Sequence, residues 1–263
     1  MSDNAVNIIR RGGAAIIEMN RPARMNAWSD ELSAALLAAV ESVADDTSIR
    51  AAMITGSGRA FSSGADLKEG IELFQSGEFD PQRILTERYH PIITGIREMA
   101  KPVVAAVNGP VAGVGVSLAL ACDLVVATQS SYFSLAFVNL GLVPDGGSSL
   151  FVPSRVGFAR AAEMAMLGEP VAAEHAAEWG LINRVYADEV FADEANALLD
   201  RLADGPTRSY AGTKQELNRW LYSNMAGQLE FEATVQREMA VSADFAEGLT
   251  AFVEKRPTKF TGA

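Results

Sequence analysis

A glycine-bearing turn around Gly64 is a candidate site for binding a negatively charged oxygen through backbone amides. The segment from residue 55 to 68 follows an apolar run and contains three glycines and three serines. Gly64 can adopt backbone angles that a side chain would forbid, so the N–H of Ala65 can point into a cleft instead of into a strand ladder. Asp66 could serve as an acid, but a carboxylate in such a turn more often accepts hydrogen bonds from nearby amides. We favour that structural role for Asp66.

A second glycine-bearing turn, at residues 108–123, leads into a predicted helix. Small apolar residues follow Gly113 and indicate a buried helix that begins at Val114. The first N–H groups of a helix have no internal acceptor and lie at the positive end of the helix dipole, so the N–H of Val114 is a second oxyanion donor. Neither turn matches the glycine motifs that bind dinucleotides or phosphates. On glycine content alone, close packing between helix and strand is the simpler explanation of both turns.

Asp145 is the candidate acid or base of such a site. It lies in the sequence Val-Pro-Asp-Gly-Gly at residues 143–147. Pro-Asp-Gly is also a common β-turn sequence, and the carboxylate could cap a helix suggested at residues 148–156. The tripeptide alone favours the turn. If Asp145 is catalytic, its apolar neighbours at 135–138 and Leu142 should raise its pKa toward the working range.

The elements that must position these residues alternate between strands and helices. Runs rich in β-branched and other apolar residues predict strands at 14–19, 51–55, 103–107, 124–127 and 182–185. Amphipathic stretches predict helices at 30–43 and 88–99, and, after the strand signals end near residue 186, at 188–202, 207–221 and 229–245. Residues 71–81 are predicted to form a loop, either a flap over an apolar ligand or a surface loop with two packed aromatics. The sequence thus predicts an α/β fold with a helical C-terminal quarter.

Composition and charge exclude several classes of function. The chain has 263 residues, 49% of them hydrophobic, and a formal net charge of −11, which would repel nucleic acid and anionic membranes. The single cysteine, Cys122, cannot form an internal disulfide, and the first residues show no apolar signal core, so we expect a cytoplasmic protein. The two histidines, His90 and His175, and the lack of spaced cysteines argue against a metal site.

Ordered stretches of the chain resemble the crotonase, or enoyl-CoA hydratase/isomerase, superfamily along nearly the full length. They are residues 20–27, 61–68, 106–109 with 113–115, 122–123, 141–147 and 251–256. The resemblance implies the crotonase-type (ClpP-like) α/β fold, with a spiral of β-β-α units at residues 1–186 that carries a coenzyme-A-thioester site. A helical trimerisation region would follow at residues 187–263. The resemblance also implies a homotrimer or a dimer of trimers that binds coenzyme A as part of the substrate, without a permanently bound cofactor.

The same resemblance assigns roles to individual residues. The amides of Ala65 and Val114 would hold the thioester oxygen, although members of the superfamily usually have glycine at the second position. Residues beside coenzyme A would be Arg24, Asn26, Ala27, Ser63, Gly64, Asp66 and Leu67. Phe252 and Lys255 would reach the ligand of a neighbouring subunit, although Lys255 could instead be a solvated charge on a terminal helix.

The residues available for proton chemistry differ from the hydratase pattern. Hydratases of the superfamily have two glutamates at positions that are Ser117 and Phe137 here. Addition of water needs one group to activate the water and one to manage the proton at Cα, so their absence favours an enoyl-CoA isomerase with Asp145 as acid and base. Within the superfamily the chain most resembles the phenylacetate-pathway isomerases of a ring epoxide of phenylacetyl-CoA, which share the patterns at 140–145 and 255–262.

Three alternatives to an isomerase remain open. A hydratase could use Asp145 together with a water molecule. A non-catalytic acyl-CoA-binding subunit would also account for the absence of the glutamates. An aryl-CoA dehalogenase would use Asp145 as a nucleophile and a histidine in the region of His90 as a base, but it requires a tryptophan where this chain has Phe137.

Overall fold

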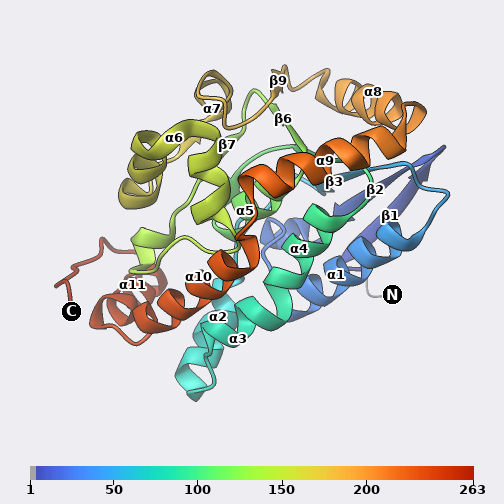
Figure 1. Ribbon diagram of the computed structural model, residues 1–263. Coiled ribbons are helices and arrows are strands. Elements are labelled where there is room, and N and C mark those ends of the chain that lie inside the picture. The colour runs from blue at the N-terminus through green and yellow to red at the C-terminus, as the bar shows by residue number, and fades with distance from the viewer. Residues whose placement is uncertain (1–3) are drawn as a thin grey trace.

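A six-stranded sheet forms the centre of the molecule in the computed structural model, which describes residues 4–263 (Figure 1). Its strand order is β1-β2-β3-β4-β6-β9, and all neighbours are parallel except the antiparallel pair β1 and β2. The strands are β1 (Val6–Arg11), β2 (Ala14–Met19), β3 (Ala51–Gly56), β4 (Val103–Val107), β6 (Leu124–Thr128) and β9 (Arg184–Tyr186). A smaller sheet, in the order β5-β7-β8, consists of β5 (Val111–Ala112), β7 (Tyr132–Ser134) and β8 (Val171–Ala172).

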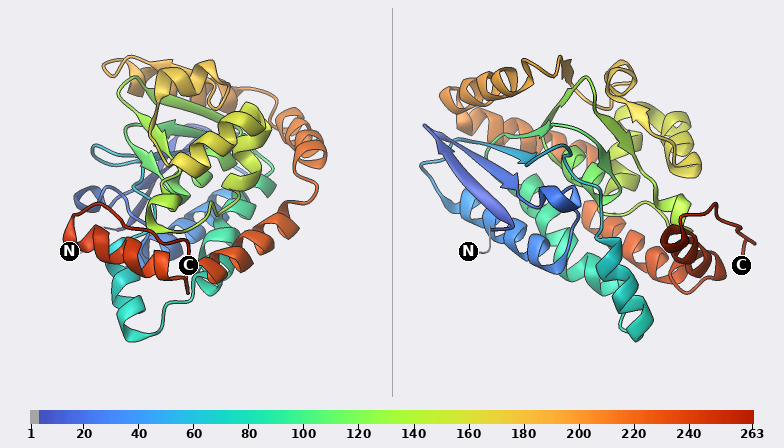
Figure 2. Two further views of the ribbon diagram at one scale, coloured as in Figure 1. Left: turned by 90° about the vertical axis from the view of Figure 1, so that its left-hand side faces the viewer. Right: turned by 180° about the vertical axis from the view of Figure 1, so that it is seen from behind.

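Helices cover both faces of the main sheet. Successive residues of a strand point to opposite faces, and apolar residues occupy both of them. Ile17, Ile54 and Ala105 face a core that includes Leu36 of α1 (Asp30–Asp45) and Ile96 of α4 (His90–Glu98). The opposite face packs against α8 (Phe191–Asp204). It brings Ala14, Met53, Val104 and Val126 of the sheet against Phe191, Leu199 and Leu202 of that helix. Figure 2 shows α8 on one side of the sheet and α1 with α4 on the other. Both faces of these strands are therefore buried, as in other parallel sheets.

The helices of the N-terminal two thirds follow or interrupt the strands. They are α1 (Asp30–Asp45), α2 (Leu67–Ser76), α3 (Pro81–Ile84), α4 (His90–Glu98), α5 (Val114–Ala121), α6 (Ser148–Leu167) and α7 (Ala173–Glu178). Short helical turns are η1 (Pro22–Arg24), η2 (Leu85–Tyr89), which is π-helical, and η3 (Phe137–Leu140). The buried helix predicted from Val114 is confirmed as α5.

Four helices follow β9 and make the C-terminal part of the chain. They are α8 (Phe191–Asp204), α9 (Thr207–Leu221), α10 (Met225–Met239) and α11 (Ala243–Glu254). In Figure 1, α9 crosses the front of the molecule, and α10 and α11 lie at the end where α2 and α3 project. The predicted helix at 229–245 was wrong at its end, because Ser242 accepts a hydrogen bond from the Phe245 amide and starts a separate helix there.

The predicted loop at residues 71–81 is also wrong for most of its length. Residues up to Ser76 belong to α2, which the Asp66 side chain caps by accepting a hydrogen bond from the Lys68 amide. Gly77, at φ 76°, ends the helix in the left-handed conformation that favours glycine. Only a short connection then leads to α3, so the glycine, serine and proline content of the segment marks the ends of two helices.

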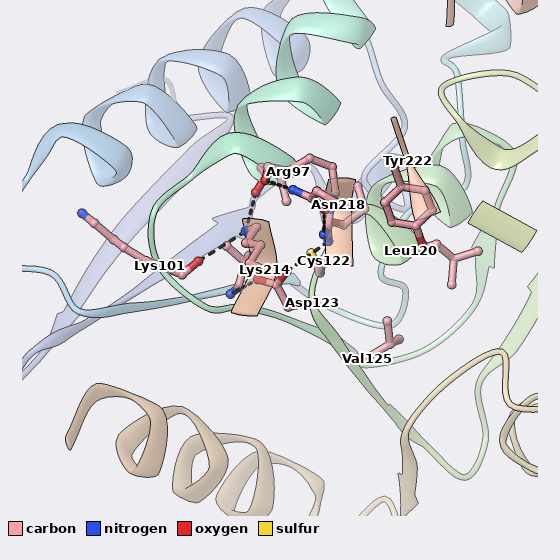
Figure 3. Close-up of polar contacts among 12 residues, drawn as sticks. Arg97, Lys101, Leu120, Cys122, Asp123, Val125, Lys214, Asn218 and Tyr222 are labelled. Atoms are coloured by element: carbon pink, nitrogen blue, oxygen red, sulfur yellow. Dashed lines mark hydrogen bonds and ion pairs between the residues drawn. The ribbon is translucent and has the colours of Figure 1, made fainter. Parts of the chain in front are cut away.

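A buried ionic cluster fastens α9 to the body of the molecule (Figure 3). Lys214 of α9 donates to the carboxylate of Asp123 at 2.9 Å and to the carbonyl of Ile96 at 2.7 Å. Arg97 reaches the other oxygen of Asp123 at 3.0 Å and also contacts Asn218, one turn after Lys214. Because Lys214 and Arg97 are both buried, these contacts replace the water that their charges would otherwise bind.

Replacing Lys214 by methionine should lower the free energy of unfolding by about 3 kcal/mol, because one partner of a buried ion pair is removed while Asp123 stays charged. Urea unfolding of the full chain measures the change. The matched control is Lys68→Met, since the Lys68–Glu72 pair is solvent-exposed and should be worth less than about 1 kcal/mol. Equal effects of the two substitutions would contradict this account.

Candidate active site at the junction of two cavities

The two glycine-bearing turns lie side by side in the structure. The Ala112 amide donates to the carbonyl of Ser62 at 2.9 Å, and the Phe61 amide donates to the carbonyl of Pro110 at 3.1 Å. Gly64 has φ 89°, and a Cβ atom there would lie 3.0 Å from the carbonyl oxygen of Ala112. Glycine is therefore needed at position 64 both for the backbone angle and for the close approach of the second turn.

Each turn leaves a backbone amide free directly after its glycine. Val114 is the first residue of α5, and Gly113 before it, at φ 53°, provides no side-chain cap. Among residues 4–263, neither the Ala65 amide nor the Val114 amide donates a hydrogen bond outside the helix and strand ladders. Both residues line one cleft of about 560 Å³, which we call the amide cleft. The amide cleft can thus bind an oxyanion with two N–H groups and no charged side chain.

Asp145 lies in the wall of the same cleft with its carboxylate almost completely buried. Only 6% of its surface is exposed, and burial, together with the charge of Glu232, raises its pKa to about 8. This confirms the predicted rise. Its Oδ2 accepts a hydrogen bond from Nε2 of Gln236 at 2.8 Å, whereas its Oδ1 has no partner among the described residues. The alternative role as a helix cap is wrong, because α6 begins after Gly147 and has no side-chain cap.

The turn that carries Asp145 is packed directly on the first turns of α5. Gly146 has φ 60°, and a Cβ atom there would lie 3.3 Å from Cγ2 of Val114. The Ser117 hydroxyl donates to the backbone carbonyl of Asp145 at 2.7 Å. Ser117, at one of the two positions where the resemblance places a hydratase glutamate, is therefore bonded to the turn that carries Asp145. The other such residue, Phe137, lines the amide cleft as an apolar wall.

Helix α10 supplies two buried polar residues that the sequence analysis missed. Glu232 accepts hydrogen bonds from the amides of Gly147 at 2.7 Å and Ser149 at 3.1 Å, and burial raises its pKa to about 6. Gln236, one helical turn later, contacts Asp145 and accepts from the Val143 amide at 3.1 Å. Two polar residues four positions apart on the apolar face of a predicted helix were the signal that could have found them.

A second cavity joins the amide cleft at Asp145. It has about 710 Å³ of open space, and we call it the aromatic chamber because Trp28, Phe79, Tyr89 and Phe245 are among its lining residues. Ala65, Leu67, Tyr89, Leu142, Asp145 and Gln236 line both cavities. A molecule that spans both cavities would therefore lie beside the two amides, the Asp145 carboxylate and the aromatic side chains.

The structure brings most of the predicted residues of the first turn to this site. Ser63, Gly64 and Leu67 line the amide cleft. Asp66 lines the aromatic chamber and is also paired with Arg21 at 3.0 Å, in addition to capping α2. Asp66 therefore has the structural role that we favoured.

Residues 24–27 mainly support the turn around Gly64. Asn26 is fully buried and its side chain bonds to the backbone of Arg21 and Ala60. Asn26 thus supports the backbone of this turn, and its proposed contact with coenzyme A stays a prediction. Ala27 is also buried, and the carbonyl of Arg24 accepts from the Ser63 hydroxyl at 3.4 Å.

Three further predicted residues lie outside the two cavities. Phe252 is exposed and Lys255 ends α11 in the left-handed conformation; neither lines the amide cleft or the aromatic chamber of its own chain. His90 is buried, which lowers its pKa to about 4, and it also lines neither cavity. The dehalogenase alternative requires a histidine base beside the substrate, and His90 lines neither cavity of this chain.

Two other kinds of feature are absent from residues 4–263. No group of three or more histidine, cysteine, aspartate or glutamate side chains is arranged to hold a metal ion in this part of the chain. In the same residues, no helix combines the length and the apolar character needed to cross a membrane.

Comparison with known proteins relates this site to a family. The family model described as enoyl-CoA hydratase/isomerase matches residues 10–263. A protein of Rhodobacter capsulatus described as a probable enoyl-CoA hydratase is 42% identical over 250 residues, which cover 95% of each chain. The 1,2-epoxyphenylacetyl-CoA isomerase of Escherichia coli is 39% identical over 251 residues, again 95% of each chain.

Solved structures agree with the sequence relatives. The crystal structure of an enoyl-CoA hydratase from Mycobacterium avium subsp. paratuberculosis matches with a TM-score of 0.88 and 36% identity over 98% of both chains. An enoyl-CoA hydratase/isomerase from Pseudoalteromonas atlantica has a TM-score of 0.86 and 31% identity, covering 98% of this chain and 100% of the other. The predicted crotonase-type α/β fold is therefore confirmed. The chain belongs to the enoyl-CoA hydratase/isomerase family of the crotonase superfamily.

Proposed function

We propose that the protein is an enoyl-CoA isomerase that moves a double bond between the β,γ and α,β positions of an acyl-CoA. The observation that carries the proposal is a buried carboxylate, Asp145, beside two free amides. The positions at which the resemblance places hydratase glutamates hold Ser117 and Phe137, and neither can activate water as a base.

The proposed reaction uses one carboxylate in both directions. Asp145 takes a proton from Cα, the C–H electron pair moves into the Cα–C1 bond, and the thioester oxygen becomes an enolate oxygen. The amides of Ala65 and Val114 stabilise that oxygen where charge develops. Asp145 then returns the proton at Cγ, where the electron pair of the former β,γ double bond forms the new C–H bond. At the same time the enolate oxygen re-forms the C1=O bond, and the Cα–C1 π pair becomes the new Cα–Cβ double bond. The reaction consumes no water and needs no oxidant or reductant.

Two rate measurements separate the isomerase from its alternatives. Purified protein is assayed spectroscopically with a 3-enoyl-CoA and, separately, with crotonyl-CoA. We expect rapid isomerisation of the first and little hydration of the second. Hydration at a rate similar to that of isomerisation would favour the hydratase alternative, in line with the name of the Rhodobacter capsulatus relative. Binding of both thioesters without turnover would instead favour an acyl-CoA-binding subunit.

We also propose that the protein acts as a homotrimer, or as a dimer of trimers, in the cytoplasm. Large apolar side chains such as Phe158 on α6 and Trp220 on α9 are more than four-fifths exposed, at 82% and 83%. Apolar surface of this kind is typically covered by another protein chain. In such an assembly the helical region at 187–263 would supply the contacts, and Phe252 and Lys255 would lie against coenzyme A in a neighbouring subunit. Light scattering of the purified chain measures its oligomeric state.

The proposed mechanism predicts a pH dependence with a definite sign. Asp145 must be ionised to accept the α-proton, and its pKa is raised to about 8, so kcat/KM for isomerisation should rise as the pH increases from 6 to 9. The apparent midpoint belongs to the coupled pair of Asp145 and Glu232. A profile that is flat over this range, or one that falls, would contradict the assignment of the base.

A further inference from the structure

We infer that Gln236 is a positioning residue that fixes which oxygen of Asp145 carries the transferred proton, and that this oxygen is Oδ1. The inference rests on the proposed function, in which Asp145 takes up and returns a proton. It concerns a residue of α10 that contacts neither of the oxyanion-binding amides.

The orientation of the Gln236 amide is determined by its partners. The backbone N–H of Val143 can only donate, so the atom of Gln236 that faces it at 3.1 Å must be the carbonyl oxygen Oε1. Nε2 then faces Oδ2 of Asp145 at 2.8 Å and can only donate. A proton on Oδ2 would point at this donor, so Oδ2 stays an acceptor in both protonation states.

The other oxygen of the carboxylate is the one open to a proton. Oδ1 is buried and has no hydrogen-bond partner among residues 4–263. Asp145 lines both the amide cleft and the aromatic chamber. An acyl chain bound across the two cavities would therefore pass Asp145, which carries the unpartnered oxygen. Oδ2 thus anchors the side chain through Gln236, and Oδ1 exchanges the proton.

Gln236 is itself held by contacts that do not depend on a ligand. Only 3% of its surface is exposed, and the same is true of Glu232 one turn before it. Glu232 joins α10 to the Asp145 turn through the amides of Gly147 and Ser149. The direction of the Gln236 amide is therefore set before substrate arrives, which is the arrangement expected for a preorganised site.

Several polar and titratable groups lie near Asp145, and a titration test must take them into account. Glu232 on α10 faces it as a second carboxylate and raises its pKa, whereas the Gln236 hydrogen bond lowers it. Tyr89 of η2 lines both cavities, and the charge of Asp145 contributes to raising the pKa of its phenol. Asp66, Glu69 and Arg88 line the aromatic chamber. Removing the Gln236 donor alone should make ionisation of Asp145 harder.

The test follows the titration of Asp145 directly. The protein is labelled with ¹³C at the aspartate carboxyl carbons, and Asp145→Asn identifies the resonance by its disappearance. In Gln236→Met the pKa of Asp145 should rise by about one unit, the size expected for losing one hydrogen bond to a carboxylate. The ionised fraction, and with it kcat at pH 7, should fall about tenfold, while KM stays within twofold.

The matched control is Gln228→Met on the same helix. Gln228 donates to the Ser149 hydroxyl at 2.8 Å and does not contact Asp145, so its loss should leave the Asp145 titration unchanged. An unchanged pKa in Gln236→Met, or an equal shift in both variants, would overturn the inference. A wild-type protein that fails to isomerise any 3-enoyl-CoA while the resonance shifts as expected would refute the proposed function and still support the role of Gln236 in setting the ionisation of Asp145.

Discussion

Asp145→Asn is expected to lower kcat for 3-enoyl-CoA isomerisation about 10³-fold, within the range of about 10²–10⁴ that a positioned acid or base contributes. Asparagine has nearly the same shape, and its amide oxygen can still accept the hydrogen bond that Gln236 now donates to Oδ2. An amide cannot accept the α-proton at neutral pH, so the loss should fall on the chemical step. Stopped-flow absorbance at saturating substrate measures it.

Binding of an acyl-CoA by the Asp145→Asn protein should distinguish a defect in the chemical step from misfolding. The amides of Ala65 and Val114 are unchanged, so the dissociation constant for a non-reactive acyl-CoA should stay close to that of the wild type. Asp188→Asn is a matched control, because Asp188 is exposed, accepts a hydrogen bond from the Ser130 amide at 3.1 Å and lines neither cavity. The activity of this variant should be unaffected. If Asp145→Asn turned over substrate at the wild-type rate, Asp145 would have only a structural role in its turn.

Val114→Pro is expected to lower kcat/KM about 10²–10³-fold, the usual result of removing one oxyanion donor. Val114 is the first residue of α5, a position that tolerates proline because its N–H has no partner within the helix. Gly113 has φ 53° and ψ −131°, the mirror image of the extended conformation that residues before proline prefer, and glycine can adopt it. The substitution therefore removes an N–H group with little demand on the backbone.

Val114→Ala provides the comparison, because it shortens the side chain and keeps the N–H. Its kcat/KM should remain within about tenfold of the wild type, since only an apolar contact with the Gly146 turn is lost. Thermal unfolding of both variants shows whether α5 is intact. Equal activity of the proline and alanine variants would mean that the Val114 amide does not hold the reacting oxygen.

The strands of the fold were largely predictable because both faces of the sheet are buried. Residues 14–19 and 103–107 match β2 and β4 without a shift, since continuous apolar runs bounded by polar residues have few alternatives. The segment 71–81 was misassigned because the glycine at 77 ends a helix that is amphipathic and mostly exposed. Local composition there resembles a loop because glycine, serine and proline mark the ends of helices as well as loops.

The candidate site was predictable in part, where it depends on local backbone geometry. The glycines at 64 and 113 allow backbone angles that orient the peptide group after each of them. The sequence therefore indicated that the amides of Ala65 and Val114 are free. Gln236 and Glu232 were missed because their partners lie far away in the sequence: Gln236 is 91 residues from Asp145. Periodicity assigned their segment to a helix, but only tertiary packing shows which turn of the chain that helix covers.

The most direct test of the central claim follows a label through the reaction. A 3-enoyl-CoA carrying deuterium at C2 is converted in ordinary water, and the product is analysed by NMR. If the buried Asp145 carries the proton from C2 to C4 of an amide-bound enolate, part of the 2-enoyl-CoA product will contain deuterium at C4. A product without deuterium at C4, or one with oxygen added at C3, would contradict the account.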